Sequence, residues 1–252
     1  MIKQKYGVVY TPKSLSDFVA ELLKRASSDE QIKVILDPAS GECALLSAAV
    51  AAFGGKNEYI GIDVDKEAVH NTKDKFHIYH NDAIMPQNVK NKTAEYWRDK
   101  LPEVDAVIAN PPWSSEKIYE KSDLTSAGFS LVSGQYDSYV LFMELAYNIL
   151  REGGLMAFII PDSLFDVQNE NLRKFLLEKT QIKVIARLGE KIFEEVNRAA
   201  TVIICKKALP DAETETICFR LSTEDRKGYL AGQGTLLTYF DEKNIQCSRK
   251  DF

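Results

Sequence analysis

The segment at 104–113 constrains the fold more than any other part of this chain. It begins with the apolar run Val-Asp-Ala-Val-Ile-Ala and ends with Asn-Pro-Pro-Trp, and a short apolar run bounded by turn-forming residues predicts a buried strand. Two successive prolines lack amide donors and have fixed φ angles, so the chain has to leave the sheet there. Because Asn110 precedes a proline, its backbone is held extended. The sequence therefore predicts a rigid loop at the carboxyl end of a buried strand, where open α/β sheets bind their ligands.

Strand-like and helical segments alternate on both sides of this motif. Short apolar runs predict six further strands, at 32–36, 58–65, 76–80, 155–161, 182–188 and 200–206. Segments with helical periodicity or composition lie between them, at 15–26, 43–53, from 66, within 86–101, and at 137–150 and 169–179. This alternation predicts an α/β fold in which helices cover both faces of a doubly wound, mostly parallel, seven-stranded sheet.

The regular pattern weakens after Pro210. Two short strand-like pieces remain, at 217–221 and 236–240, and no internal repeat appears. We therefore expect a main domain at 1–207 and a C-terminal extension at 208–252, which could be the start of a further region.

Acidic residues follow three of the predicted strands. Asp37 opens the turn Asp-Pro-Ala-Ser-Gly, Asp63 ends the next strand, and Asp82 follows the third, although alone it would pass for a turn residue. Gly41 allows close approach to the backbone. The segment lacks the Gly-x-Gly-x-x-Gly pattern of diphosphate-binding loops, and an acid at a strand end suits a cationic ligand. A carboxylate placed like Asp63 is the usual acceptor for ribose hydroxyls, whereas Asp65 is better explained as a helix N-cap.

Composition limits the classes of function. The 252 residues carry a net charge of −5 and are 45% hydrophobic and 27% charged, which is ordinary for a soluble globular protein. No apolar run has the length of a transmembrane helix, and the first residues lead into no signal-peptide core, so we expect a cytoplasmic protein without membrane contact. The four cysteines are far apart and no carboxylate pair accompanies the three histidines, which argues against a metal site or a disulfide framework.

These motifs, in this order, resemble those of the adenine-N6 DNA methyltransferases of restriction–modification systems, which use S-adenosylmethionine. The similarity covers residues 6–207 and includes a Thr-Pro ahead of the first strand, the Asp-Pro-x-x-Gly cofactor loop and the Asn-Pro-Pro-aromatic loop. Cys43 departs from the pattern, since the family has a second glycine there. The resemblance implies that 1–207 is the catalytic domain, with a Rossmann-like methyltransferase sheet whose last strand is reversed.

The resemblance also implies roles for individual residues. The expected catalytic loop is Asn110, Pro111, Pro112 and Trp113, and Trp113 is expected to stack on the target base together with Phe193. Core packing is an equally good explanation of Phe193. The expected cofactor-binding residues lie in the entry segment, the cofactor loop and the next two strand ends: Tyr10, Thr11, Asp37, Pro38, Ala39, Gly41, Asp63, Asp82 and Ala83.

The Asn-Pro-Pro loop offers a way to overcome the chemical difficulty of methylating adenine. The lone pair of the N6 amine is delocalised into the ring, which makes this nitrogen a poor nucleophile. Two acceptors, the Asn110 side-chain oxygen and the Pro111 carbonyl, would favour a pyramidal amine with a localised lone pair. The base has to leave the duplex to reach such a pocket, and stacking on Trp113 would offset that cost.

Two other functions stay open. Asn-Pro-Pro-aromatic loops also occur in methyltransferases that modify protein glutamine side chains, although the Thr-Pro segment and Phe193 favour adenine. The second alternative is a non-catalytic cofactor-binding subunit of a restriction complex; the intact Asn110 argues against it and Cys43 leaves it open. Proteins that bind duplex DNA without help from another domain usually carry a basic face. Because this chain is acidic, we expect a target-recognition domain or specificity subunit outside it.

Overall fold

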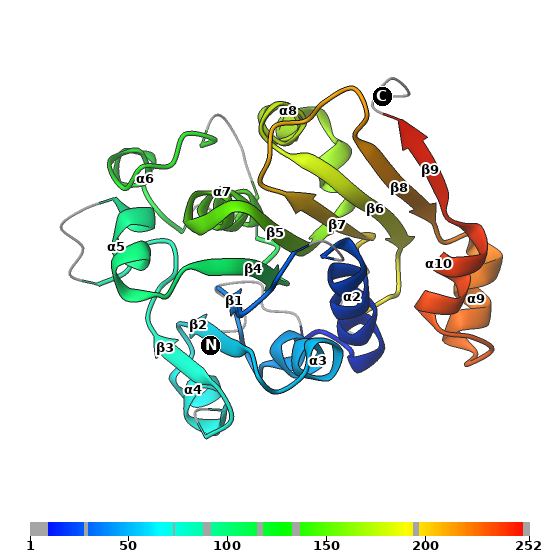
Figure 1. The fold of residues 1–252 in the computed structure, drawn as a ribbon, viewed down its shortest axis with the longest axis horizontal. Helices are drawn as coiled ribbons and strands as arrows, with labels where there is room; N and C mark the ends of the chain where they lie inside the picture. Colours follow the sequence, from blue (N-terminus) through cyan, green and yellow to red (C-terminus); the bar gives the residue numbers. More distant parts are fainter. Residues whose placement is uncertain are drawn as a thin grey trace.

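A mixed β-sheet with helices on both faces forms the body of the protein (Figure 1). The computed structural model describes residues 10–27, 30–72, 74–87, 92–114, 118–132, 137–193 and 197–248. Within these ranges the sheet has nine strands in the order β3-β2-β1-β4-β5-β7-β6-β8-β9. The strands are β1 (Val34–Asp37), β2 (Glu58–Asp63), β3 (His77–His80), β4 (Val104–Ala109), β5 (Leu150–Pro161), β6 (Gln181–Gly189), β7 (Ala200–Lys206), β8 (Glu215–Arg220) and β9 (Ile245–Ser248).

The strand directions confirm the predicted α/β fold with a reversed strand. Strands β3, β2, β1, β4 and β5 are parallel neighbours, and β7 lies antiparallel between β5 and β6. The expectation of seven strands was too low, because β8 and β9 lengthen the sheet beyond β6. Strand β8 pairs in parallel with β6, with Ile217 beside Val184 and Phe219 beside Ala186, and thereby continues its apolar face.

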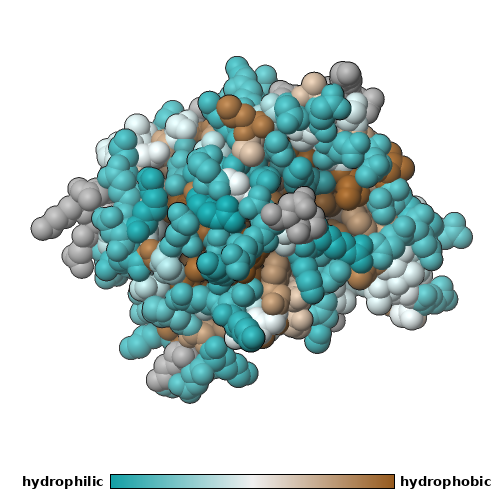
Figure 2. All heavy atoms as spheres, in the orientation of Figure 1, coloured by the Kyte–Doolittle hydropathy of each residue, from teal (hydrophilic) through white to brown (hydrophobic). Residues whose placement is uncertain are grey.

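Two apolar layers hold the helices on the sheet. One layer lies beneath α2 (Lys13–Ala26), α3 (Ala44–Phe53) and α10 (Leu236–Lys243), and the other beneath α5 (Thr93–Lys100), α7 (Tyr139–Ile149) and α8 (Glu170–Lys179). The remaining helices are α4 (Lys66–Thr72), α6 (Lys121–Ser126) and α9 (Thr223–Leu230), with 3-10 turns η1 (Asp162–Phe165) and η2 (Val167–Asn169) after β5. Most of the face in Figure 2 is hydrophilic. No helix in the described ranges is long and apolar enough to span a membrane.

The C-terminal segment contains a helix where a strand was expected. The piece at 236–240 belongs to α10, whose first turn is capped by the Thr235 hydroxyl accepting from the Thr238 amide. Leu236 and Phe240 are four residues apart and both buried, which is helical rather than strand spacing. The Phe240 ring meets Phe18 of α2 edge-on, and this contact anchors α10 to the domain. The long polar segment after the Pro-Pro loop likewise contains the short helix α6.

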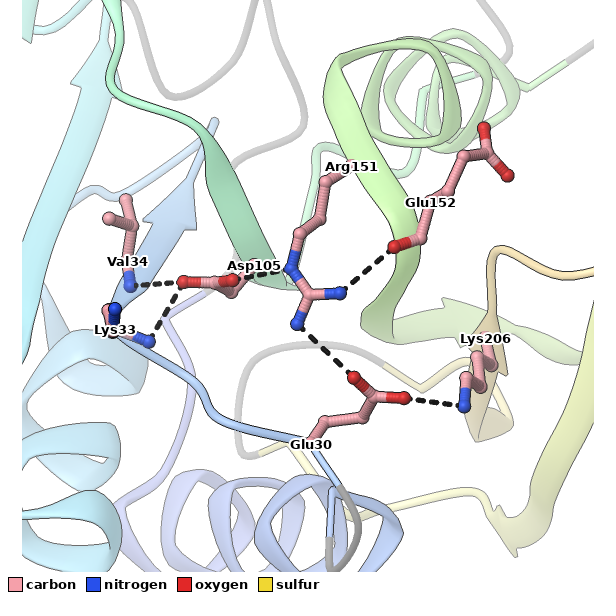
Figure 3. Close-up of polar contacts among 7 residues, drawn as sticks. All are labelled: Glu30, Lys33, Val34, Asp105, Arg151, Glu152 and Lys206. Carbon is pink, nitrogen blue, oxygen red and sulfur yellow. Dashed lines mark hydrogen bonds and ion pairs between the residues drawn. The ribbon is translucent and has the colours of Figure 1, made fainter.

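Asp105 ties three strands together at the amino edge of the sheet (Figure 3). One carboxylate oxygen accepts from the Lys33 and Val34 amides at 2.8 and 2.9 Å, and the other accepts from Arg151 Nε at 2.6 Å. Burial alone would raise the pKa of Asp105, but Arg151 and the two amides outweigh burial and lower it. Arg151 and Lys206 also pair with Glu30, at 3.3 and 2.6 Å. The network therefore joins the starts of β1, β4 and β5 to the end of β7.

We predict that Asp105→Ala lowers the free energy of unfolding by about 3 kcal/mol, because it leaves two amides and a guanidinium without their acceptor. Urea denaturation measures the change. The control is Glu152→Ala, whose side chain is 83% exposed and whose loss should cost less than about 0.5 kcal/mol. An Asp105→Ala protein as stable as the control would show that the network contributes nothing.

Candidate functional site

A pocket opens at the carboxyl edge of the sheet, where β1, β2, β3 and β4 end. The segment before α2 and the first turns of α3 and α7 complete its wall. Most of the expected site residues line it: Tyr10, Thr11, Asp37, Pro38, Ala39, Gly41, Asp63, Asp82, Ala83, Asn110 and Pro112. The lining also contains residues that the sequence did not single out, among them Ser40, Glu42, Asn81, Ile118, Tyr119, Ser138, Leu141 and Phe142.

The turn after β1 is tied to the end of β2. The Gly41 amide donates to Asp63 Oδ2 at 2.6 Å, and the Asp65 amide donates to Asp63 Oδ1 at 2.8 Å. Gly41 has φ of +47°, with open space where a side chain would be. Asp65 caps the next helix as expected, since its side chain accepts from the Glu67 amide. The carboxylate of Asp63 thus shapes the turn on the wall of the pocket.

The backbone conformation at Cys43 explains why the family pattern has a glycine at this position. Its φ is +61°, in the left-handed region that favours glycine. The side chain is buried, and burial raises the pKa of its thiol to about 11. The backbone therefore keeps the conformation that a glycine would adopt, and the substitution fills space on the core side of the loop.

Two carboxyl groups give the pocket an unusual charge environment. Asp37 is 1% exposed, and burial, with a further contribution from the charge of Asp63, raises its pKa to about 8. Burial also raises the pKa of Asp63. No lysine or arginine forms an ion pair with either acid within the described ranges. A cation entering this pocket would therefore favour the charged form of both groups.

Asp82 is held between a backbone turn and a tyrosine. Its Oδ1 accepts from the amides of Ile84 and Met85 at 2.8 and 3.0 Å, and its Oδ2 accepts from the Tyr119 hydroxyl at 2.7 Å. Tyr119 lies a few residues after the Asn-Pro-Pro loop in the chain and contacts Asp82 just beyond the end of β3. No local pattern in the sequence indicated this contact.

Side chains from distant parts of the chain hold the loop that carries Asn110. Asn110 Nδ2 donates to Thr11 Oγ1 at 3.0 Å, which joins the loop to the entry segment. The Ser138 hydroxyl donates to the Pro112 carbonyl at 2.5 Å and accepts from the Ser114 amide at 3.1 Å. Ser138 was not predicted, because a serine before a helix usually indicates only a cap. Here it fixes the path of the loop instead.

The expected base-stacking residues lie behind the pocket. Trp113 and Phe193 are 5% and 3% exposed and meet edge-on, with ring centroids 5.1 Å apart. Trp113 Nε1 donates to the Ile159 carbonyl at 3.3 Å, and Arg198 donates to the Trp113 carbonyl at 2.7 Å. Neither ring lines the pocket, and buried Pro111 does not line it either. Of the entry segment, the part before Tyr10 lies outside the described residues, as does 194–196 of the loop with Phe193.

The sequence and the fold are both similar to those of restriction–modification methyltransferases. A type I restriction enzyme MjaVII methylase subunit from Methanocaldococcus jannaschii is 26% identical over 242 residues, which cover 86% of this chain and 39% of that protein. A type II methyltransferase, M.TthHB8I from Thermus thermophilus, is 24% identical over 211 residues, covering 80% and 45%. A type I restriction–modification methyltransferase subunit from Streptococcus thermophilus superimposes with a TM-score of 0.71 at 17% identity, covering 99% of this chain and 59% of that one.

A candidate class I S-adenosylmethionine-dependent methyltransferase from Listeria monocytogenes has the same fold, with a TM-score of 0.68 at 24% identity and coverage of 94% and 74%. The first curated relatives are longer than this chain, which spans 39% to 54% of their length. The family model described as N-6 DNA Methylase matches residues 2–246. The chain therefore belongs to the N-6 DNA methylase family.

Proposed function

We propose that this chain transfers a methyl group from S-adenosylmethionine to the N6 amine of adenine in DNA, as the catalytic part of a restriction–modification enzyme. The observation that carries the proposal is the position of Asn110, on the wall of the same pocket as Asp37, Asp63 and Asp82. A methyl acceptor held by the amide and a methyl donor held by the acids would meet there.

The acids suit the chemical groups of S-adenosylmethionine. In this proposal Asp63 accepts from the ribose hydroxyls, and Asp82 accepts from the amine of the cofactor's adenine. Asp37, buried without an ion-pair partner among the described residues, suits the positive charge of the methionine part. When bound, the cofactor supplies an electrophilic methyl group on its sulfonium.

Asn110 and the backbone of its loop would act on the target amine. The hydrogen bond from Asn110 Nδ2 to Thr11 fixes the plane of the amide, so the amide oxygen points away from Thr11 and can accept from the amine. The Pro111 carbonyl is the second proposed acceptor. Ser138 keeps the loop in place through the next carbonyl, that of Pro112. Orienting the lone pair in this way needs no covalent intermediate.

Base stacking by Trp113 and Phe193 stays a prediction. Both rings are buried in the described structure, so stacking requires one of them to turn toward the pocket. Adenine in DNA is favoured over protein glutamine because the relatives named above are restriction–modification methyltransferases. Tritiated-methyl transfer to adenine-rich DNA, compared with transfer to protein, separates the two. Since the relatives are longer than this chain, we also propose that target recognition involves a domain or subunit outside it.

We predict that Asn110→Ala lowers kcat for methyl transfer by about 100-fold or more, the usual loss when a polar group acting mainly in the transition state is removed. The affinity for S-adenosylhomocysteine should change little, because Asn110 is assigned to the target and not to the cofactor. Steady-state kinetics and calorimetry measure the two quantities. Parallel losses of cofactor affinity and turnover would instead identify Asn110 as structural.

A second prediction concerns the ribose. Asp63→Ala should weaken S-adenosylhomocysteine binding by about 1–3 kcal/mol, because two hydroxyls lose their acceptor. Asp65→Asn is the control, since an asparagine can still cap α4. If calorimetry gives the same affinity for Asp63→Ala and the control, Asp63 does not belong to the cofactor site.

The third prediction follows from the pKa of Asp37, about 8. The ammonium group of the methionine part binds the charged carboxylate better, so affinity for S-adenosylhomocysteine should rise from about pH 6.5 to pH 8.5 as Asp37 loses its proton. Because burial raises the pKa of Asp37 from 3.8 to about 8, this group should make folding progressively less favourable as pH rises from its unfolded pKa to its folded pKa. Asp37→Asn should bind with weaker, nearly pH-independent affinity. A wild-type affinity that is flat over this range contradicts the assignment.

A further inference from the structure

Arginines from four parts of the chain surround the carboxyl end of β6. Arg187 lies in β6, and Arg220 is its register partner in β8, so both side chains lie on the same face of the sheet. Arg226 of α9 reaches the last residue of β6, since a Cβ added at Gly189 would overlap its Nη1. Arg198 comes from the segment just before β7 and donates to the carbonyl of Trp113.

Three of these four arginines form no ion pair with another described residue. Arg187 pairs with Asp162 at 2.5 Å and lies 4.6 Å from the centre of the Phe165 ring. By contrast, Arg198, Arg220 and Arg226 take part in none of the ion pairs between described residues. Guanidinium groups gathered near one strand end repel one another, and an anionic partner would lower that repulsion.

The position of these arginines relative to the pocket limits which kind of anionic partner they can bind. Arg198 contacts the residue that follows Asn110-Pro111-Pro112, so the cationic surface begins where the proposed catalytic loop ends. It lies on the carboxyl edge of the sheet, as the pocket does. At the amino edge, the cations Arg151 and Lys206 are paired with acids (Figure 3). Arginines without an ion-pair partner among the described residues thus lie at the edge of the sheet where a target base would enter.

We propose that Arg198, Arg220 and Arg226 form a contact surface for the phosphate backbone of DNA beside the target base. This inference rests on the proposed function. Guanidinium groups bind phosphate oxygens through paired hydrogen bonds and stay charged at all relevant pH values. Arg187 is not part of this surface, because Asp162 neutralises its charge. A chain of net charge −5 thereby offers DNA a local positive surface.

The test reverses charge at the two arginines that do not touch the catalytic loop. The double variant Arg220→Glu and Arg226→Glu is compared with Lys56→Glu and Lys75→Glu, exposed lysines at the amino edge without ion pairs among the described residues. Both double variants change the net charge equally. Fluorescence anisotropy measures binding of a short duplex from about 50 to 200 mM salt, and calorimetry measures binding of S-adenosylhomocysteine.

The arginine variant should bind the duplex at least about tenfold more weakly than the lysine control at the lowest salt. Its slope of log K against log salt should be smaller by about 1.8, or 0.9 for each lost phosphate contact. Affinity for S-adenosylhomocysteine should match the wild type in both variants. The neutral pair Arg220→Gln and Arg226→Gln should reproduce the change in slope, which keeps the test valid if charge reversal disturbs folding.

Four outcomes would overturn the assignment. Equal losses in the arginine and lysine variants would show that only net charge matters. An equal loss of binding to polyglutamate would assign the surface to an acidic polypeptide. If the wild type and the arginine variant bind the duplex equally tightly, the surface is refuted and the proposed function is unaffected. If the wild type binds S-adenosylhomocysteine but no duplex at low salt, the surface fails as a DNA contact, and the proposed function is then tested separately by tritiated-methyl transfer.

Discussion

The buried carboxylate of Asp105 determines how the centre of the sheet is aligned. Strand β1 is short, and its ladder to β4 contains only the pairs Ile35–Ala106 and Leu36–Val107. Asp105 extends that contact by accepting from two amides at the start of β1, and it binds Arg151 of β5 with its other oxygen. The opposite ends of β1 and β4 carry Asp37 and Asn110. An interaction at the amino edge therefore contributes to the alignment of two neighbouring strands whose carboxyl ends line the pocket.

The sequence was sufficient for those parts of the molecule that depend on periodicity and strand ends. Buried parallel strands have long apolar runs, and their carboxyl ends meet at one edge, so Asp37, Asp63 and Asn110 could be assigned to one site. α10 was mistaken for a strand because a short segment with two apolar residues fits either period. The contact of Tyr119 with Asp82 joins residues 37 positions apart, and Ser138 acts through loop carbonyls. Contacts of both kinds depend on the folded path of a loop, which has no local signal.

Charge is distributed unevenly along the carboxyl edge of the sheet. The ends of β1, β2 and β3 carry acids, and burial, with a smaller contribution from the charge of Asp63, raises the pKa of Asp37. The ends of β6 and β8 carry arginines instead. Strands β4, β5 and β7 lie between the two regions. One edge of one sheet can therefore accommodate a cationic ligand and a polyanionic ligand side by side.

The hydrogen bond between Tyr119 and Asp82 has a thermodynamic consequence. Asn110 and Tyr119 lie close together in the chain and both line the pocket, at the places proposed for the target base and for the cofactor. If a ligand at Asp82 favours one placement of the segment that joins them, a ligand at Asn110 experiences the same preference. The coupling free energy is reciprocal, and each ligand changes the affinity for the other by the same factor. Cofactor affinity and target affinity would then be linked through one hydrogen bond.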